Sequence, residues 1–556
     1  MFCFFIIIPL LMDVGAGLIK RRTKFGEVIG LIYTSPSGNT VEKYLGLPYA
    51  RAPVGQFRFE YPIPLHSFPA VPYNATFRRP WCLQDDMYVY RSIGNEDCLY
   101  LNIFTPHETT NNSRYPVLFW IHGGSYKSWS GNVFDVDGAI DNFVSKGIIL
   151  VTINFRLGAL GFMSLLNSKL PGNYGLEDQL LALKWVNKYI DDFSGDKDSI
   201  TICGESSGAA SANLLAFSPK STGFFHKIIM ISGAAPAPWA IAPEVTKYFT
   251  KQIIDHIRCQ GEDELECLKF QPYFRMSFGG TMAPIKDASH NTADPFSEEL
   301  MIQMTPVVDN YRGSDAIVPF PLWQLITMSK LQVPVLMGFS RGELPRPVFH
   351  RAKKFSYLLP LGRLNNRREV NRREAVEIIK KHYCGNSSDE TCIQLERQIS
   401  VQIYNDYIMN VPVCMMAKLF EKCRAPTYVY CYDLKNDRSD EPAEHLSDVA
   451  FLFNNPSLII NNVNPPDIPL PAPQIKSFIF DSFLNFIKTG DPNNNQSISS
   501  FGFWPKYKPG ESSVVRIQND IIKLEGCYEN EGEFWQSLDV EYAKYSAIKF
   551  RILQEK

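Results

Sequence analysis

Short apolar runs alternate along the chain with segments of helical periodicity. The runs at residues 99–104, 117–121 and 148–155 predict strands, and the last is so continuous that it is typical of a strand buried on both faces of a sheet. Residues 178–190 carry apolar side chains at helical spacing and predict a helix with one broad buried face. Strands that alternate with helices in this way predict an α/β fold with a large, mostly parallel sheet flanked by helices.

The second half of the chain keeps both patterns at wider intervals. Further strands are predicted at residues 200–203, 227–232, 333–339 and 427–432, and further helices at 209–217, 245–257 and 475–488. Gly490 and Pro492 end the last of these helices. No internal repeat or clear linker divides the chain, and we therefore expect a single domain over residues 18–556.

Composition narrows the class of protein. Of the 556 residues, 45 % are hydrophobic and 21 % are charged, which is typical of a globular chain that buries a large core. The formal net charge of −2 offers no basic surface to a nucleic-acid partner. The sequence has no apolar run of about 18 residues, so we expect no membrane-spanning helix.

The N-terminus has the features of a targeting segment. Residues 1–12 are apolar and are followed by the small residues Gly15, Ala16 and Gly17. This resembles the hydrophobic part and cleavage zone of a signal peptide, although the usual basic segment before them is missing. We expect residues 1–17 to be a signal peptide and the protein to be secreted or to reside in the endomembrane lumen. The alternatives are a short N-terminal anchor or a wrongly assigned start, and a cytoplasmic protein.

The cysteines suggest an oxidising compartment. Three pairs are close in sequence and enclose polar stretches, as small disulfide loops do: Cys82–Cys98, Cys259–Cys267 and Cys384–Cys392. Cys203 lies in a predicted strand and is interpreted as a buried apolar residue. Acceptor sequences for N-linked glycans occur at Asn74, Asn111, Asn386 and Asn495. A long, Asn-rich chain contains several of these by chance, so they add little to the argument for secretion.

The segment with the clearest chemistry is residues 204–208, Gly-Glu-Ser-Ser-Gly, between a predicted strand and a predicted helix. It fits G-x-S-x-G, the nucleophile elbow, in which a sharp turn presents a serine hydroxyl clear of the backbone. A serine hydroxyl is a weak nucleophile and needs an adjacent base. Ser206 is therefore the candidate nucleophile, and a Gly/Ser turn without chemistry is the alternative.

A second small-residue segment follows the strand predicted at residues 117–121. Residues 122–126, His-Gly-Gly-Ser-Tyr, can aim backbone N–H groups into a cavity without side-chain obstruction, as the HGGG segment of α/β-hydrolases does. Together with the N–H of Ser207 they would form an oxyanion hole, where one donor is typically worth about 3 kcal/mol in the transition state. A tight turn of no chemical meaning is the alternative.

A base and an orienting acid complete such a site, and in hydrolases of this fold the chain order is Ser, acid, His. Of the histidines after Ser206, His445 follows the strand predicted at residues 427–432, where catalytic loops emerge from α/β sheets. Glu343 follows the strand predicted at 333–339 and is a candidate to hold the histidine tautomer. Spacing alone leaves other histidines and carboxylates open; Asp448 lies three residues past His445.

With these segments in place, the chain resembles the carboxylesterase type B, or cholinesterase-like, family of α/β-hydrolases from about residue 25 to residue 510. The matching motifs lie at residues 96–102, 172–179, 204–209, 338–343, 445–448, 489–493 and 504–505. The resemblance implies an α/β-hydrolase fold with Ser206 as nucleophile, Glu343 as acid and His445 as base. It further implies an oxyanion hole of Gly124, Ser125 and Ser207, a second carboxylate near the base at Glu205, and the bridges Cys82–Cys98 and Cys259–Cys267.

The chain departs from the family pattern at several positions. Ser125 and Ser207 replace the more usual Gly and Ala, although each still provides a backbone N–H, and Leu344 replaces the common Gly after the acid. The loop between Cys82 and Cys98 lacks the tryptophan on which cholinesterases stack choline, which leaves Tyr88 and Tyr90 as weaker cation–π partners.

These observations predict a serine carboxylesterase that acts on a small-molecule or lipid ester, prefers neutral to choline esters, and needs no metal or organic cofactor. An enzyme tuned to lipid esters is one alternative, because the pocket residues fall in the irregular middle of the chain. A catalytically silent, neuroligin-like adhesion protein of the same fold is the other, although here all three triad positions are filled.

Overall fold

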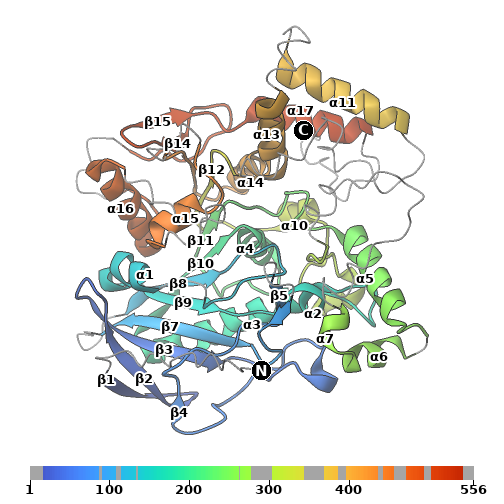
Figure 1. Ribbon diagram of the computed structural model, residues 1–556. Coiled ribbons are helices and arrows are strands. Elements are labelled where there is room, and N and C mark those ends of the chain that lie inside the picture. Colours follow the sequence, from blue (N-terminus) through green and yellow to red (C-terminus); the bar gives the residue numbers. More distant parts are fainter. Residues whose placement is uncertain are drawn as a thin grey trace, which may run out of the picture.

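A computed structural model describes residues 17–86, 91–107, 114–132, 136–261, 263–276, 303–343, 369–385, 396–435, 442–455, 471–493 and 503–542. A 13-stranded sheet crosses the molecule in the order β1-β2-β3-β7-β9-β8-β10-β11-β12-β13-β14-β15, with β4 beside β2 (Figure 1). Its strands are β1 (Gly17–Thr23), β2 (Gly26–Thr34), β3 (Thr40–Pro48), β4 (Tyr73–Asn74), β7 (Tyr100–Pro106), β8 (Tyr115–Ile121), β9 (Ile149–Ile153), β10 (Gly195–Glu205), β11 (Lys227–Ile231), β12 (Val335–Ser340), β13 (Thr427–Tyr432), β14 (Val514–Ile517) and β15 (Ile522–Glu525). A separate pair consists of β5 (Gln84–Asp86) and β6 (Arg91–Ile93).

The middle of the sheet is parallel and its ends are antiparallel. From β9 through β8, β10, β11, β12 and β13 to β14, every neighbouring pair is parallel. Antiparallel pairing joins β1, β2, β3, β7 and β9 at one end and β14 to β15 at the other. The predicted α/β fold with a mostly parallel sheet is therefore confirmed. The carboxyl ends of the parallel strands, where ligands bind in such sheets, lie along one edge.

Alternate side chains of the parallel strands enter two cores, one on each face of the sheet. In β8, Phe119 belongs to the first core and its neighbour Trp120 to the second. The first core is covered by α3 (Tyr174–Tyr189), α4 (Ser207–Phe217) and α14 (Val411–Lys422), and the second by α1 (Val136–Asn142), α15 (Ser447–Leu452) and α16 (Pro473–Thr489). Burial on both faces explains why these strands appear in the sequence as continuous apolar runs.

The remaining α-helices add buried side chains to the first core or form a third one. They are α2 (Gly158–Phe162), α5 (Pro243–Ile257), α6 (Glu264–Phe270), α7 (Tyr273–Met276), α10 (Leu322–Met328), α11 (Glu369–Cys384), α13 (Glu396–Asn405) and α17 (Glu529–Tyr542). Helices α11, α13 and α17 pack with α14 around a third, smaller core at one end of the molecule (Figure 1). Among the described residues, none of the helices is long and apolar enough to cross a membrane.

Disulfides join several described cysteines. Cys82–Cys98 and Cys259–Cys267 are linked as the sequence predicts. Cys384 is also disulfide-bonded, and Cys392, its predicted partner, lies outside the described residues. Cys414–Cys527 is a further bridge that the spacing does not suggest, because 113 positions separate the two cysteines. Cys203 is buried and free, as expected. Of the four glycan acceptors, Asn74 is exposed and the other three lie outside the described residues.

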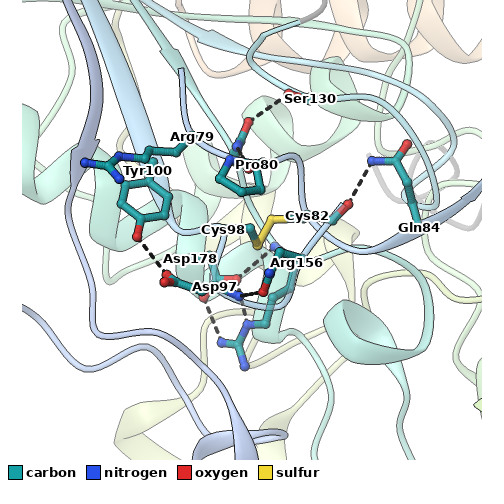
Figure 2. Close-up of a disulfide and its surroundings, with 12 residues drawn as sticks. Arg79, Pro80, Cys82, Gln84, Asp97, Cys98, Tyr100, Ser130, Arg156 and Asp178 are labelled. Atoms are coloured by element: carbon teal, nitrogen blue, oxygen red, sulfur yellow. Dashed lines mark hydrogen bonds and ion pairs between the residues drawn. A yellow bond between two sulfur atoms is a disulfide. The ribbon is translucent and has the colours of Figure 1, made fainter. Parts of the chain in front are cut away.

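The Cys82–Cys98 disulfide lies beside a buried ion pair (Figure 2). Arg156 Nε and Nη2 donate to the two carboxylate oxygens of Asp178 at 2.8 and 2.7 Å, and both residues are buried. Gln84, inside the bridged loop, donates to the Cys82 carbonyl at 2.9 Å and accepts from Trp129 N at 2.7 Å. The disulfide loop is thereby fastened to the segment that follows residues 122–126.

We expect loss of the Cys414–Cys527 bridge to destabilise the fold more than loss of the short Cys259–Cys267 bridge. In the chain-entropy model a cross-link that closes about 100 residues contributes about 4.7 kcal/mol, and one that closes a loop of about 10 residues contributes roughly 3 kcal/mol or less. Urea midpoints of the Cys414→Ala/Cys527→Ala and Cys259→Ala/Cys267→Ala variants measure the difference. An equal or smaller loss in the first variant would contradict the expectation.

Candidate active site

Ser206 occupies a strained turn between β10 and α4. Its φ of 53° and ψ of −122° lie outside the regions that L-residues normally adopt. The turn is held because Ser206 N–H donates to the Ile231 carbonyl at 2.8 Å. Gly208 is required beside it, since a Cβ at this position would lie 2.2 Å from the Ile121 carbonyl oxygen. The sequence motif thus has the strand–turn–helix context that a nucleophile elbow needs.

His445 and Glu343 are brought together at the ends of neighbouring strands. Glu343 follows β12, and His445 lies between β13 and α15. His445 Nδ1 donates to Glu343 Oε2 at 2.5 Å, and the His445 backbone N–H donates to the Glu343 carbonyl at 3.0 Å. The other carboxylate oxygen of Glu343 accepts from Ser340 N at 2.8 Å, and the side chain is fully buried. This acid therefore fixes both the orientation and the tautomer of the imidazole.

The second nitrogen of the imidazole faces the residue before the serine. His445 Nε2 lies 3.1 Å from Glu205 Oε1, and the described structure has no hydrogen bond between His445 and the Ser206 hydroxyl. Glu205 is fully buried, and burial raises the pKa of its carboxyl group while His445 opposes that shift. Burial disfavours the imidazolium, but attraction to Glu343 and Glu205 outweighs it and raises the pKa of His445 well above its usual value.

Asp448 is near this cluster but does not touch the histidine. Its carboxylate accepts from the Tyr430 hydroxyl at 2.8 Å and from the Val449 N–H at 2.8 Å. Burial raises the pKa of Asp448 to about 7, with a further contribution from the charge of Glu343. Glu343, and not Asp448, is therefore the carboxylate bonded to His445 Nδ1.

The loop after β8 turns sharply, with three consecutive residues at positive φ: Gly124 at 95°, Ser125 at 56° and Tyr126 at 57°. Within the described residues, the backbone N–H groups of Gly124, Ser125 and Ser207 have no hydrogen-bond acceptor. Ser207 is buried, whereas Gly124 and Ser125 are half-buried. These three free donors are the ones that the family resemblance assigns to an oxyanion hole, and they are available to an acceptor from a substrate.

Each of these donors lies on a peptide whose carbonyl is anchored. Because N–H and C=O point in opposite directions across a planar trans peptide, holding the carbonyl aims the N–H. The Gly123 carbonyl accepts from His122 Nδ1 at 2.8 Å. The Gly124 carbonyl accepts from the N–H groups of Lys127 and Ser128, both at 3.0 Å, and the Ser206 carbonyl accepts from Ala210 N at 3.1 Å. The N–H groups of Gly124, Ser125 and Ser207 are on those three peptides.

The sequence reasoning missed His122 as part of this arrangement. Its ring is buried and stacks on Phe155 with 4.4 Å between centroids, and burial lowers its pKa to about 4. The imidazole is therefore neutral at neutral pH, with its proton on Nδ1, which donates to the Gly123 carbonyl. The signal in the sequence was its position directly before the small-residue run. Tyr88, Tyr90 and Leu344, at which the chain departs from the family pattern, lie outside the described residues.

Comparison with known proteins shows the family to which the chain belongs. Residues 19–535 match the carboxylesterase family. The chain belongs to that family. It is 28 % identical over 557 residues to gut esterase 1 of Caenorhabditis briggsae, covering 93 % of this chain and 92 % of that protein. It is 29 % identical to a carboxylic ester hydrolase of Bombus ignitus, over 95 % of each chain, and 29 % identical to a cholinesterase of Mus musculus, over 90 % of this chain and 83 % of that one.

The family match, together with relatives named as ester hydrolases, makes this chain an ester hydrolase. Relatives of both kinds, for carboxylic esters in general and for choline esters, are equally similar to the chain. The carboxylic ester hydrolase and the cholinesterase are both 29 % identical to the chain.

Replacing Glu205 by Gln should shift the acidic limb of the esterase's pH–rate profile toward lower pH. A histidine acts as base only when neutral, and the pKa of His445 is raised partly by the Glu205 carboxylate. With that charge removed, the imidazolium loses its proton at lower pH. If His445 is the base, the plateau rate at high pH should fall as well, because the same carboxylate would stabilise the imidazolium formed during the reaction. A kcat/KM profile of Glu205→Gln against wild type tests this, and an unmoved acidic limb would contradict it.

Proposed function

We propose that the protein is a serine carboxylesterase that works through an acyl-enzyme. Ser206 Oγ attacks the ester carbonyl carbon as His445 Nε2 takes its proton. His445 then returns the proton to the departing alkoxide, which leaves as an alcohol. Water attacks the acyl-enzyme in the same way, giving its proton to His445, and the carboxylic acid leaves as Ser206 is restored. This cycle needs no metal or organic cofactor.

The observation that carries the proposal is the position of His445 between Glu343 and the nucleophile elbow. Nδ1 is bonded to Glu343, and Nε2 is 3.1 Å from Glu205, the chain neighbour of Ser206. We expect His445 Nε2 to bond to the Ser206 hydroxyl in the substrate complex. Catalytic hydrogen bonds are often unformed without substrate and tighten only in the complex. Glu205 would stabilise the imidazolium that each proton transfer creates.

The N–H groups of Gly124, Ser125 and Ser207 would bind the oxyanion of both tetrahedral intermediates. They are unpaired and lie on anchored peptides, so little reorganisation is needed when the charge develops. Donors of this kind act most strongly in a site from which water is excluded.

Fluorophosphonate labelling tests the proposal directly. Such a reagent phosphonylates an activated serine, and peptide mapping should find the adduct on Ser206 and on no other serine. Ester hydrolysis should disappear in proportion to the adduct formed. Labelling that persists undiminished in Ser206→Ala would overturn the assignment of the nucleophile.

Neutral esters are the proposed substrates. The loop between Cys82 and Cys98 has no tryptophan to stack on a quaternary ammonium. A desolvated cation–π contact is worth about 2 kcal/mol. Its absence corresponds to roughly a thirtyfold lower kcat/KM for a choline ester than for a matched neutral ester, because each 1.36 kcal/mol is tenfold. Butyrylcholine and a neutral butyrate ester with the same leaving-group pKa provide the comparison, and a preference for butyrylcholine would reject this substrate class. A series of longer acyl chains tests the lipid-ester alternative.

We also propose that the protein is secreted or enters the endomembrane lumen, with residues 1–17 removed as a signal peptide. The disulfides among the described cysteines support this, since such bonds persist in oxidising compartments. The N-terminal sequence of the protein recovered from culture medium, together with non-reduced peptide maps, is the test. Recovery from cytosol with free thiols at these positions would reject it.

A further inference from the structure

Ser207 has a backbone N–H and a hydroxyl group, and the proposed mechanism uses only the N–H. Its backbone N–H is one of the three unpaired donors. Its hydroxyl oxygen accepts a hydrogen bond from the Tyr126 N–H at 3.2 Å, across 81 positions of sequence. The residue is fully buried at the start of α4. A single side chain thus joins the helix that supplies one donor to the loop that supplies the other two.

The loop needs such a fastening because of the residue at position 125. Ser125 is held at φ 56° and Tyr126 at φ 57°, a region where a Cβ is crowded and where glycine is the usual occupant. Left to itself, a serine at this position favours negative φ. A change in φ at Ser125 is a rotation about its N–Cα bond. It would turn the Gly124–Ser125 peptide, which carries one of the proposed hole donors, relative to the rest of the loop.

Tyr126 is fixed from both sides of its backbone. Its N–H is bonded to Ser207 Oγ, and its carbonyl accepts from Gly158 N at 2.7 Å. Its ring is fully buried and packs on Phe162 with 5.0 Å between centroids. The peptide between Ser125 and Tyr126 is therefore clamped through its nitrogen, and this clamp opposes the relaxation of Ser125.

We propose that the Ser207 hydroxyl is a positioning group for the oxyanion hole, which holds the strained Ser125 in the conformation that aims its N–H at the developing oxyanion. This inference rests on the proposed serine mechanism and deepens it. It also connects the two positions, 125 and 207, at which serine replaces the more usual Gly and Ala of the resembling family. The second serine compensates for the conformational cost of the first.

The test is a double-mutant cycle with Ser207→Ala and Ser125→Gly. Both substitutions retain every backbone N–H of the hole. Full loss of one oxyanion donor lowers kcat by about 100- to 1,000-fold, and a donor that is only misaligned should cost less, so we expect roughly a tenfold loss of kcat in Ser207→Ala. KM should be nearly unchanged. The inhibition constant of a trifluoromethyl ketone, whose adduct places an oxyanion in the hole, should rise by the same factor as kcat falls.

In the Ser125→Gly background, Ser207→Ala should have little effect, because glycine holds positive φ without a clamp. Independent sites would instead give the same fold-change in both backgrounds, within about twofold. Equal fold-changes, or an unchanged kcat in Ser207→Ala, would overturn the inference. Ser207→Cys, which keeps a weaker acceptor at the same position, should fall between Ser and Ala.

Ser218→Ala is the matched control. Ser218 is also buried, lies at the other end of α4, and its hydroxyl also accepts a backbone N–H, that of Lys220 at 3.3 Å. It should lose thermal stability much as Ser207→Ala does while keeping kcat and inhibitor affinity. A kcat loss equal to that of Ser207→Ala would show a general effect on the helix and overturn the inference. Esterase activity that survives Ser206→Ala would overturn the proposed mechanism as well, whereas activity that depends on Ser206 but not on Ser207 would reject only the positioning role.

Discussion

Ser206→Ala is expected to lower kcat by about a millionfold, the usual cost of removing the nucleophile of a serine hydrolase triad. The loss is not total in such enzymes, because the oxyanion hole and substrate binding still accelerate attack by water to some degree. Here the proposed hole donors belong to the backbone of residues 124, 125 and 207 and remain in place in the variant. KM should therefore change little, and the loss should appear in kcat.

The same variant should retain its fold. The strained φ of 53° at Ser206 is imposed by the Ile231 hydrogen bond and by the close approach of Gly208 to β8, and neither depends on the hydroxyl. Within the described part of the chain the Ser206 hydroxyl makes no hydrogen bond to His445, so its removal leaves no partner there unsatisfied. Thermal midpoints of wild type and Ser206→Ala should be close. A Ser206→Ala enzyme with more than a few per cent of wild-type kcat would reject Ser206 as nucleophile.

The fold could be predicted from the sequence because the central parallel strands are buried on both faces and therefore are continuous apolar runs. Continuous apolar runs identified β8, β9, β11, β12 and β13, and the helix predicted at residues 178–190 is α3, which begins earlier, at Tyr174. The edges were harder to predict. β1, β2 and β15 are partly exposed and antiparallel, so their apolar positions are interrupted by polar ones and the signal is weak.

For the site, motifs indicated which residues come together but not how they are held. Residues 343 and 445 are 102 positions apart, and only the adjacent ends of β12 and β13 show that their side chains meet. The anchors of the hole, such as His122 and Ser128, act through backbone carbonyls, which no residue-type pattern reports. Cys414–Cys527 was missed for a related reason. Pairing of distant cysteines depends on how α14 and the segment before α17 pack, and spacing carries no information on that packing.

His445→Ala should be about as damaging as Ser206→Ala, since members of a triad act as a unit. Glu343→Gln should cost less, about ten-thousandfold in kcat. The amide preserves the shape of the buried carboxyl, but it can present an N–H to His445 Nδ1 and so favour the wrong tautomer. It also removes the charge that stabilises the imidazolium during each proton transfer. Both effects act on the transition state, so KM should be nearly constant.

Asp448→Asn is the matched control for Glu343→Gln. Both changes neutralise a buried acid near His445, but Asp448 is bonded to the Tyr430 hydroxyl and not to the imidazole. Its pKa is raised to about 7, so much of it is already protonated at neutral pH, and an amide oxygen can still accept the tyrosine hydroxyl. We expect kcat within several-fold of wild type, since the two variants differ in whether the altered group touches the base. If Asp448→Asn loses as much as Glu343→Gln, the loss reflects the charge of the whole cluster, and Glu343 is not the acid that orients His445.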